Sequence, residues 1–222
     1  MNLLSLCQAA QREMGVSGSG PATAVNATGF AAKVVAWVQQ ASSEIQGKHP
    51  TWRFLWRQTD LALTQGKQVY ARQDFGQPNI KVWRGDGCNL YRPIEGPNAR
   101  YWPAFMSWMD YQYLTRQYSA QGMPQYVAER PDLSLSFFPV PDGDYVFSAE
   151  YYVKPIPLVK NTDVPLMPEE FHMIIAWRAV MFYAGSDSDP GLLVHAAAQY
   201  STLMSAMEMD QLDPMEMAGA EV

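Results

Sequence analysis

Glu169 and His172 are the pair of side chains in this sequence whose spacing best suits metal chemistry. A carboxylate and an imidazole three positions apart on one helix point the same way, as in helical proteins that hold two metal ions. Such a site needs a second pair of this kind and two further inward-facing acids. The sequence supplies no second pair, so we expect neither a metal ion nor metal-dependent catalysis here.

The other histidines and the two cysteines stand apart from the partners that catalysis requires. His195 has no carboxylate three or four positions away, and His49 lies in an expected turn. Cys7 and Cys88 are far apart in the sequence, which favours two free thiols over a disulfide or a ligand pair. No Gly-x-Ser-x-Gly motif is present either. We therefore expect no enzyme activity and no cofactor.

Two short segments resemble ligand-binding loops without completing them. Residues 18–20 read Gly-Ser-Gly, but no Lys-Ser/Thr pair follows, so we interpret them as a flexible loop and not a phosphate loop. Residues 186–189 read Ser-Asp-Ser-Asp, but Pro190 follows and no bidentate Glu stands at the calcium-loop offset. Helix capping by Asp189 explains this segment better.

The segment 52–57, Trp-Arg-Phe-Leu-Trp-Arg, interleaves cations with aromatic rings. Such a pattern is compatible with stacking on single-stranded nucleic acid. The chain as a whole is acidic, which favours a packing role at a junction between domains or subunits. In that interpretation Trp52, Leu55 and Trp56 wedge two layers together. Arg53 and Arg57 then stay solvated or pair with an acid of a neighbouring chain.

Composition places the chain among globular proteins. Its 222 residues are 48% hydrophobic, 13% aromatic and 17% charged, too rich in core-forming residues for a disordered chain. No apolar run approaches the about 20 residues of a membrane span, and no signal peptide is recognisable. The net charge of -6 excludes general affinity for nucleic acid, so any DNA contact must be local or weak.

Helical patterns occupy both ends of the sequence. Asn2 is a suitable N-cap for a first helix that ends near Gly15, and Thr28 for a second that ends near Gly47. A third helix is expected to start at Pro168, and a fourth at Pro190 with Asp189 as its cap.

The middle of the sequence alternates between apolar and polar residues and is punctuated by turns, as antiparallel strands are. Pairs containing glycine at 65–66, 86–87 and 142–143 predict three hairpin turns. A short helix is expected from Pro103, placed at its first position, to Tyr118.

Together these patterns predict an α+β protein. Residues 1–50 and 158–210 form an antiparallel helical bundle, and residues 51–157 form an inserted antiparallel β-sandwich-like domain. Residues 211–222 form an extended, acidic C-terminal arm. Methionines alternate with acids in this arm, which suits docking on a partner as well as a frayed terminus.

Several motifs resemble those of the head-to-tail adaptor (connector) proteins of tailed bacteriophages. They are Met-Asn-Leu-Leu-Ser-Leu-Cys-Gln at 1–8, Gly-Val-Ser-Gly-Ser-Gly-Pro at 15–21, Val-Ala-Trp-Val at 35–38, Trp-Arg-Phe-Leu-Trp at 52–56, Tyr-Tyr-x-Lys-Pro at 151–155, and Asp-x-Pro-x-Met-Pro-Glu-Glu-Phe-His at 163–172. The likeness spans nearly the whole chain. None of these motifs is a catalytic signature.

The resemblance implies a structural protein of the virion, assembled in the bacterial host cytoplasm. Its copies would form a ring, a dodecamer of about 12 subunits with heterologous contacts, between the portal protein and a downstream tail or nozzle protein. Genome DNA would pass through the lumen without specific binding, and no membrane is involved. The C-terminal arm would bind the portal through apolar side chains, namely Met207, Met209, Leu212, Met215 and Met217.

Two other functions stay open at this stage. The aromatic-rich β domain suits a tail-associated module that binds a glycan or another host-surface ligand in a concave pocket. A metal-dependent hydrolase using His172 with Glu169 is the enzymatic alternative, and it requires stoichiometric metal.

Overall fold

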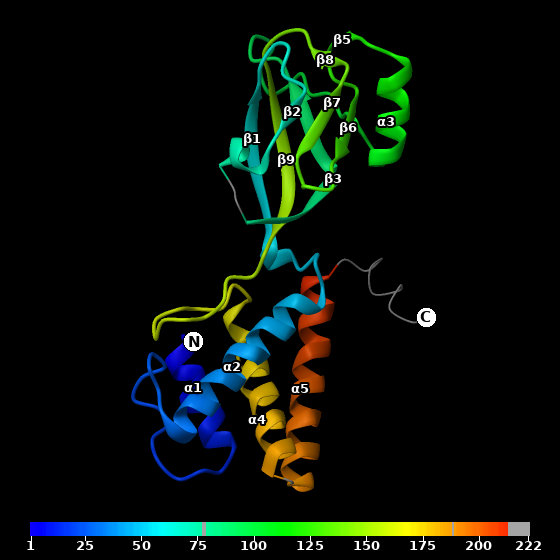
Figure 1. Cartoon of the computed structure of the whole chain (residues 1–222). Helices are drawn as coiled ribbons and strands as arrows, with labels where there is room; N and C mark the ends of the chain where they lie inside the picture. Colours follow the sequence, from blue (N-terminus) through cyan, green and yellow to red (C-terminus); the bar gives the residue numbers. More distant parts are fainter. Residues whose placement is uncertain (77–78, 188, 213–222) are drawn as a thin grey trace. The chain divides into compact units, whose positions relative to one another are not determined.

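The chain folds into two compact units, each described here by itself. The helical unit comprises Met1–Leu55 and Pro155–Val222, and the β unit comprises Trp56–Lys154. The computed structural model describes residues 1–76, 79–187 and 189–212 (Figure 1). Over these residues the protein is mixed α+β, with five α-helices and three sheets.

The first two helices of the helical unit begin at residues suited to capping. α1 spans Leu3–Glu13, and the Asn2 side chain accepts a hydrogen bond from the Ser5 amide at 2.9 Å, which confirms the predicted cap. α2 spans Gly29–Lys48. Thr28 precedes it in extended conformation but makes no side-chain capping bond, so that part of the prediction is wrong.

The last two helices follow the proline-rich segment after the β unit. A 3₁₀ turn, η3 (Glu169–Phe171), precedes α4 (Met173–Asp187). α5 spans Pro190–Gln211, and the Asp189 carboxylate accepts from the Leu192 amide at 2.9 Å, as predicted.

α4 is the central helix of this unit. It packs against α1, α2 and α5, whereas α5 packs mainly against α4 (Figure 1). Two ion pairs join the helices: Arg178 of α4 donates to Glu44 of α2 at 2.9 and 3.0 Å, and Lys48 of α2 lies 2.6 Å from Glu208 of α5. No described helix is both long and apolar enough to cross a bilayer.

The β unit contains two main sheets. In the first, β1 (Trp56–Leu63), β9 (Tyr145–Val153) and β3 (Ile80–Tyr91) pair antiparallel in the order β1-β9-β3. The second has the order β2-β7-β6-β4, with its strands at Val69–Tyr70, Leu135–Phe138, Tyr126–Glu129 and Ala104–Met106. β5 (Gln121–Gly122) and β8 (Val140–Pro141) form a short third pair.

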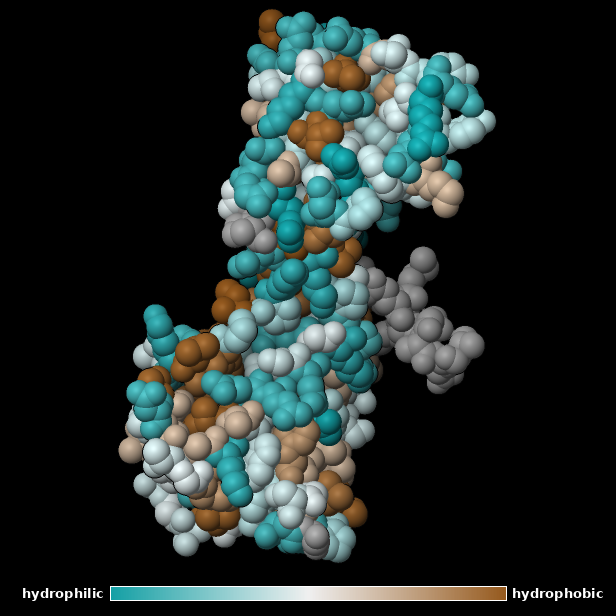
Figure 2. All heavy atoms as spheres, viewed as in Figure 1, coloured by the Kyte–Doolittle hydropathy of each residue, from teal (hydrophilic) through white to brown (hydrophobic). Residues whose placement is uncertain are grey.

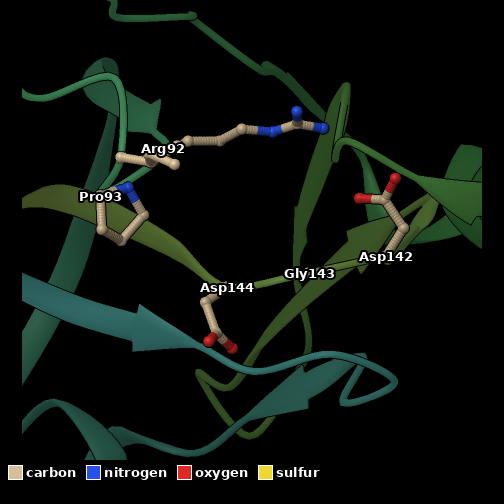
Figure 3. Close-up of a pocket in the computed structure, with 6 residues that line it drawn as sticks. Arg92, Pro93, Asp142, Gly143 and Asp144 are labelled. Carbon is tan, nitrogen blue, oxygen red and sulfur yellow. The ribbon is translucent and has the colours of Figure 1, made fainter.

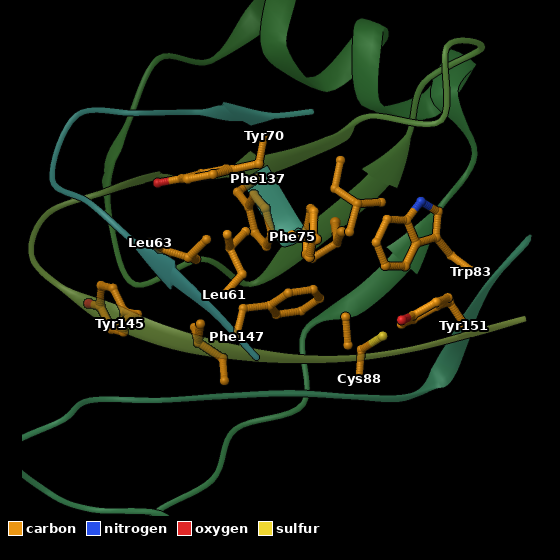
Figure 4. Packing of buried hydrophobic residues seen from close by; sticks show 14 of the residues in the cluster. Leu61, Leu63, Tyr70, Phe75, Trp83, Cys88, Phe137, Tyr145, Phe147 and Tyr151 are labelled. Atoms are coloured by element: carbon orange, nitrogen blue, oxygen red, sulfur yellow. The ribbon is translucent and has the colours of Figure 1, made fainter. Parts of the chain in front are cut away.

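A large hydrophobic cluster joins the two main sheets of the β unit. It draws side chains from both main sheets, including Leu61 of β1, Tyr70 of β2, Phe137 of β7 and Phe147 of β9 (Figure 4). Phe137 and Phe147 meet edge to face with ring centroids 4.9 Å apart. Alternate residues of β9, from Tyr145 to Tyr151, enter this core, and Ser148 and Tyr152 on its other face are buried as well.

Three local expectations for the β unit are wrong. Asp86-Gly87 forms no hairpin, because β3 runs continuously through it with a shift in register between Arg84 and Asn89. α3 begins at Trp108 with Ser107 as its cap, and not at Pro103, because residues 104–106 join a sheet first. Most pairings are antiparallel as predicted, but β4 pairs with β6, and β5 with β8, in parallel.

Candidate functional site

His172 is held by its own chain and is closed to a metal ion. Its ring is buried, with Nε2 lying 3.0 Å from the Met167 carbonyl oxygen and Nδ1 lying 2.6 Å from the Met1 amino nitrogen. Nε2–H therefore donates to the carbonyl, and Nδ1 accepts from the ammonium group. Burial lowers the pKa of His172, which suits the neutral ring that this pattern requires.

Glu169, the proposed partner of His172, points to the same ammonium group. Its carboxylate accepts from the Met1 nitrogen at 3.1 Å and is largely exposed. Within the part of the chain that the structure describes, no three His, Cys, Asp or Glu side chains gather closely enough to hold a metal ion. Through the Met1 amino group, Glu169 and His172 fasten the start of α1 to the segment before α4. This geometry does not support a metal-dependent hydrolase.

The other two histidines also make structural contacts. His49 Nε2 lies 3.2 Å from Glu208, which Lys48 contacts too. Burial raises the pKa of Glu208, but the hydrogen bonds from Lys48 and His49 outweigh burial, so its pKa lies below the usual value. His195 packs edge to face on Trp177 with ring centroids 5.4 Å apart.

The two cysteines are poor nucleophiles. Both thiols are free and buried. Burial raises the pKa of Cys7 to about 12, and burial likewise raises that of Cys88 to about 12. Since the thiolate is the reactive form, neither residue is available for nucleophilic catalysis near neutral pH.

The glycine-rich loop that follows α1 packs against that helix. Gly20 has a φ of +83°, and a Cβ atom there would lie 2.9 Å from the Gln8 backbone. The Gln8 side chain donates to the Pro21 carbonyl at 3.1 Å. These contacts explain the glycine through close packing, without a bound phosphate.

The aromatic and basic segment at 52–57 splits at the boundary between the units. Trp52 is fully buried in the helical unit, where its indole donates to the Ile45 carbonyl at 3.3 Å and stacks on Phe54 with ring centroids 5.6 Å apart. The ring is therefore closed to a nucleotide base. Arg53 donates to the Asp210 carbonyl at 3.0 Å, which ties the segment to the end of α5.

Trp56 lies in a different environment from Trp52. It belongs to β1, is 37% exposed, and donates from Nε1 to the Glu150 carboxylate at 3.0 Å. The expectation that Trp56 is a buried wedge is therefore wrong. Arg57 donates to the Trp56 carbonyl at 2.6 Å. Whether these residues contact a neighbouring subunit stays a prediction.

The described side chains among those assigned to the C-terminal arm are either buried or exposed. Met207 and Leu212 are buried in the helical unit, so the structure holds them in its core, away from a partner. Met209 is 67% exposed on the outside of α5. Met215 and Met217 lie outside the described residues. Of the predicted arm, 211–222, the two described residues belong to the helical unit: Gln211 ends α5 and Leu212 is buried, so the predicted start of the arm is wrong. That the remaining residues contact a partner stays a prediction.

A pocket that the sequence did not reveal lies at one end of the β unit. It has a volume of about 440 Å³ and is lined by residues 92–94 and 142–144. Arg92 extends toward Asp142 (Figure 3), and Tyr145 links them, accepting from Arg92 at 3.1 Å and donating to Asp142 at 2.6 Å. The sequence identified Asp142 only as a turn residue.

This pocket offers neither catalysis nor glycan stacking. Arg92 and Asp142 are already engaged with Tyr145, so their contacts order the loop that leads into β9. The described residues that line the pocket include no aromatic ring on which a sugar could stack. The glycan-binding alternative therefore gains no support from it.

Comparison with known proteins identifies the kind of protein that uses this fold. No curated protein matches the chain. The family model of the SU10 adaptor protein, a phage head-to-tail adaptor, matches residues 1–221. This match confirms the resemblance that the sequence motifs indicated, and the chain belongs to the SU10 adaptor protein family.

Proposed function

We propose that this chain forms a ring, a dodecamer of about twelve copies, that joins the portal of the phage head to the tail. The observation that carries the proposal is the family match over residues 1–221. Membership of an adaptor family assigns the chain a structural role in the virion and an interaction with other head and tail proteins. Ring closure, the portal contact and assembly in the host cytoplasm are the steps we add.

The distribution of charge supports a channel that DNA crosses freely. The helical unit carries the whole net charge of -6, because it contains six basic and twelve acidic residues. The β unit contains ten basic and ten acidic residues, so its net charge is zero. An acidic surface repels the phosphate backbone and lets a duplex slide. We propose that the assembled ring lines the channel without binding DNA specifically.

The C-terminal arm is the proposed contact with the portal. Beyond Leu212 the chain ends in Asp-Pro-Met-Glu-Met-Ala-Gly-Ala-Glu-Val, which combines acids with two methionines. Thioether side chains adapt to irregular apolar pockets. Met209, exposed near the end of α5, extends the same chemistry onto the helix.

A chain that ends at Leu212 tests the arm. Because Leu212 and Met207 stay in the core, we expect this chain to keep the melting temperature of the full protein while losing binding to purified portal rings. The matched control replaces Met215 and Met217 with Leu, which preserves apolar bulk and should preserve binding. Unchanged binding by the shortened chain would remove the arm from the proposed function.

A further inference from the structure

α5 exposes a long surface without charge. Only Ala196, Met204 and Met207 of its 22 residues are buried, and residues 190–207 include no Asp, Glu, Lys or Arg. An exposed helix face normally carries charged side chains. One exposed residue per turn lines the outside of this uncharged stretch, and we call this set the α5 face: Val194, Ala198, Ser201 and Ser205.

A second apolar surface is built by two loops of the helical unit. Val25, Val159 and Val164 are 44%, 61% and 56% exposed, and we call this set the valine loops. The loops touch each other, because the Asn161 side chain accepts from the Ala24 amide at 2.7 Å. Hydrophobic side chains are exposed on the side of the helical unit where these loops lie (Figure 2).

Hydrogen bonds hold the valine loops in a fixed conformation. The Asp163 carboxylate accepts from the Val159 and Lys160 amides, each at 2.7 Å. The Asp163 carbonyl accepts from the Leu3 amide at 2.8 Å, which fastens the loop to α1. The amide donors lower the pKa of Asp163, so the carboxylate stays ionised and bonded. An apolar surface ordered in this way is preorganised for a contact, since little entropy is lost on binding.

The two surfaces lie on different sides of the helical unit. α4 separates α5 from α1, to which the valine loops are bonded (Figure 1). A closed ring of more than two copies is built from heterologous contacts, in which one face of a copy meets a different face of the next. The α5 face carries no charged side chain, and the valine loops hold one base and one acid, Lys160 and Asp163. The two surfaces can therefore meet without placing acids against acids, although the unit as a whole is strongly acidic.

We propose that the α5 face of one copy packs against the valine loops of the next copy. The occupant of each surface is therefore a second copy of this chain. This inference rests on the proposed ring and adds to it the two surfaces that join neighbouring subunits. It also explains why α5 lacks charge over most of its length while being exposed in the isolated chain.

Charge substitutions test the pairing of the two surfaces. The phage used lacks the gene for this chain, and the host cell expresses the wild-type or variant protein. Val194→Glu and Val159→Glu should each reduce the yield of infectious particles at least about tenfold, because an unpaired charge in an apolar contact is costly. Both side chains are exposed, so each variant should keep its melting temperature. Ala36→Glu, an exposed site on α2 outside both surfaces, is the matched control and should leave the yield unchanged.

Combining the substitutions distinguishes a direct contact from two separate defects. Val194→Glu together with Val159→Lys should restore the yield, because each contact then holds one acid and one base. Val194→Glu together with Val159→Glu should not. Equal yields from these two combinations, or single variants without effect, would overturn the pairing.

A photoreactive phenylalanine analogue at position 194 identifies the neighbour directly in assembled particles. We expect a cross-linked dimer of this chain whose joined peptides contain position 194 and residues 21–27 or 155–165. Cross-links to a second α5, to another virion protein, or to nothing would overturn the inference while leaving the adaptor role intact. Particles that lack the chain altogether would refute the proposed function itself.

Discussion

The helical unit and the β unit reach stability by different means. The β unit is electrically balanced and holds 19 of the 28 aromatic residues, and some of them, such as Phe137 and Phe147, pack edge to face between its sheets. The helical unit holds the entire net charge and all three histidines, and ion pairs join its helices. The difference implies that salt and pH act mainly on the helical unit, while changes in side-chain volume are felt most in the β unit.

Truncating the core of one unit should leave the other folded, and this is the largest effect we expect. Phe147→Ala should destabilise the β unit by about 3–5 kcal/mol, because it leaves a cavity among packed rings. Trp52→Ala should do the same to the helical unit. Calorimetry should show one transition shifted and the other unchanged in each variant. Ile94→Ala, at a site 93% exposed, is the neutral control.

A single transition that moves as a whole in both variants would contradict the separation of the two units. It would mean that their cores unfold as one cooperative structure.

β3 contains a bulge where its register with β9 shifts between Arg84 and Asn89. After core truncation, substitution in this bulge should have the next largest effect on the stability of the β unit. A Cβ atom on Gly87 would clash with the Glu150 carboxylate, which would have to move away from Trp56. Gly87→Ala should therefore cost about 1–3 kcal/mol, as other overpacked sites do. Gly143→Ala, with open space around the added methyl group, should cost close to nothing in the same urea titration. Equal midpoints for both variants would show that Glu150 does not occupy the bulge.

Trp56 should be much less sensitive than Trp52. Its ring is partly exposed, so Trp56→Ala loses a fraction of its packing and one hydrogen bond to Glu150. We expect a loss of about 1–2 kcal/mol in the β unit transition. Trp56→Phe, which keeps most of the packing, should recover about half of it. A loss as large as that of Trp52→Ala would restore the buried role that the sequence suggested.

Acid should weaken the helical unit before the β unit, and this is the smallest effect. Burial holds the pKa of His172 below its ordinary value of 6.5, so the unfolded chain binds more protons than the folded one as the pH falls through 6.5. The stability that the neutral His172 ring contributes is present above pH 6.5 and declines as the pH falls below that value. The β unit contains no histidine.

Melting curves at pH 7.5 and 5.5 measure this effect, and His172→Gln should flatten the dependence. An equal shift in both units would show that a histidine is not the cause.

Sequence patterns succeeded where the signal is local. Asn2 and Asp189 cap the helices that they were predicted to cap, because a cap needs only its own side chain and the next three amides.

Sequence patterns gave wrong predictions where strand pairing, or the course of the chain from one element to the next, determines the conformation of a residue. Asp86-Gly87 suits a turn and a bulge equally well, and pairing with β9 selects the bulge. Trp52 and Trp56 look alike in sequence, but the change from the 3₁₀ turn η1 (Arg53–Leu55) to β1 directs Trp56 outward. The valine loops and the pocket beside Arg92 are made by segments distant in sequence, so no spacing rule reveals them.

Electron cryo-microscopy of intact particles tests the central claim most directly. We predict a closed ring of this chain at the neck, between the portal and the tail, with the helical units of neighbouring copies in contact. Particles whose neck lacks this chain, or that hold it only as isolated copies elsewhere, would contradict the account.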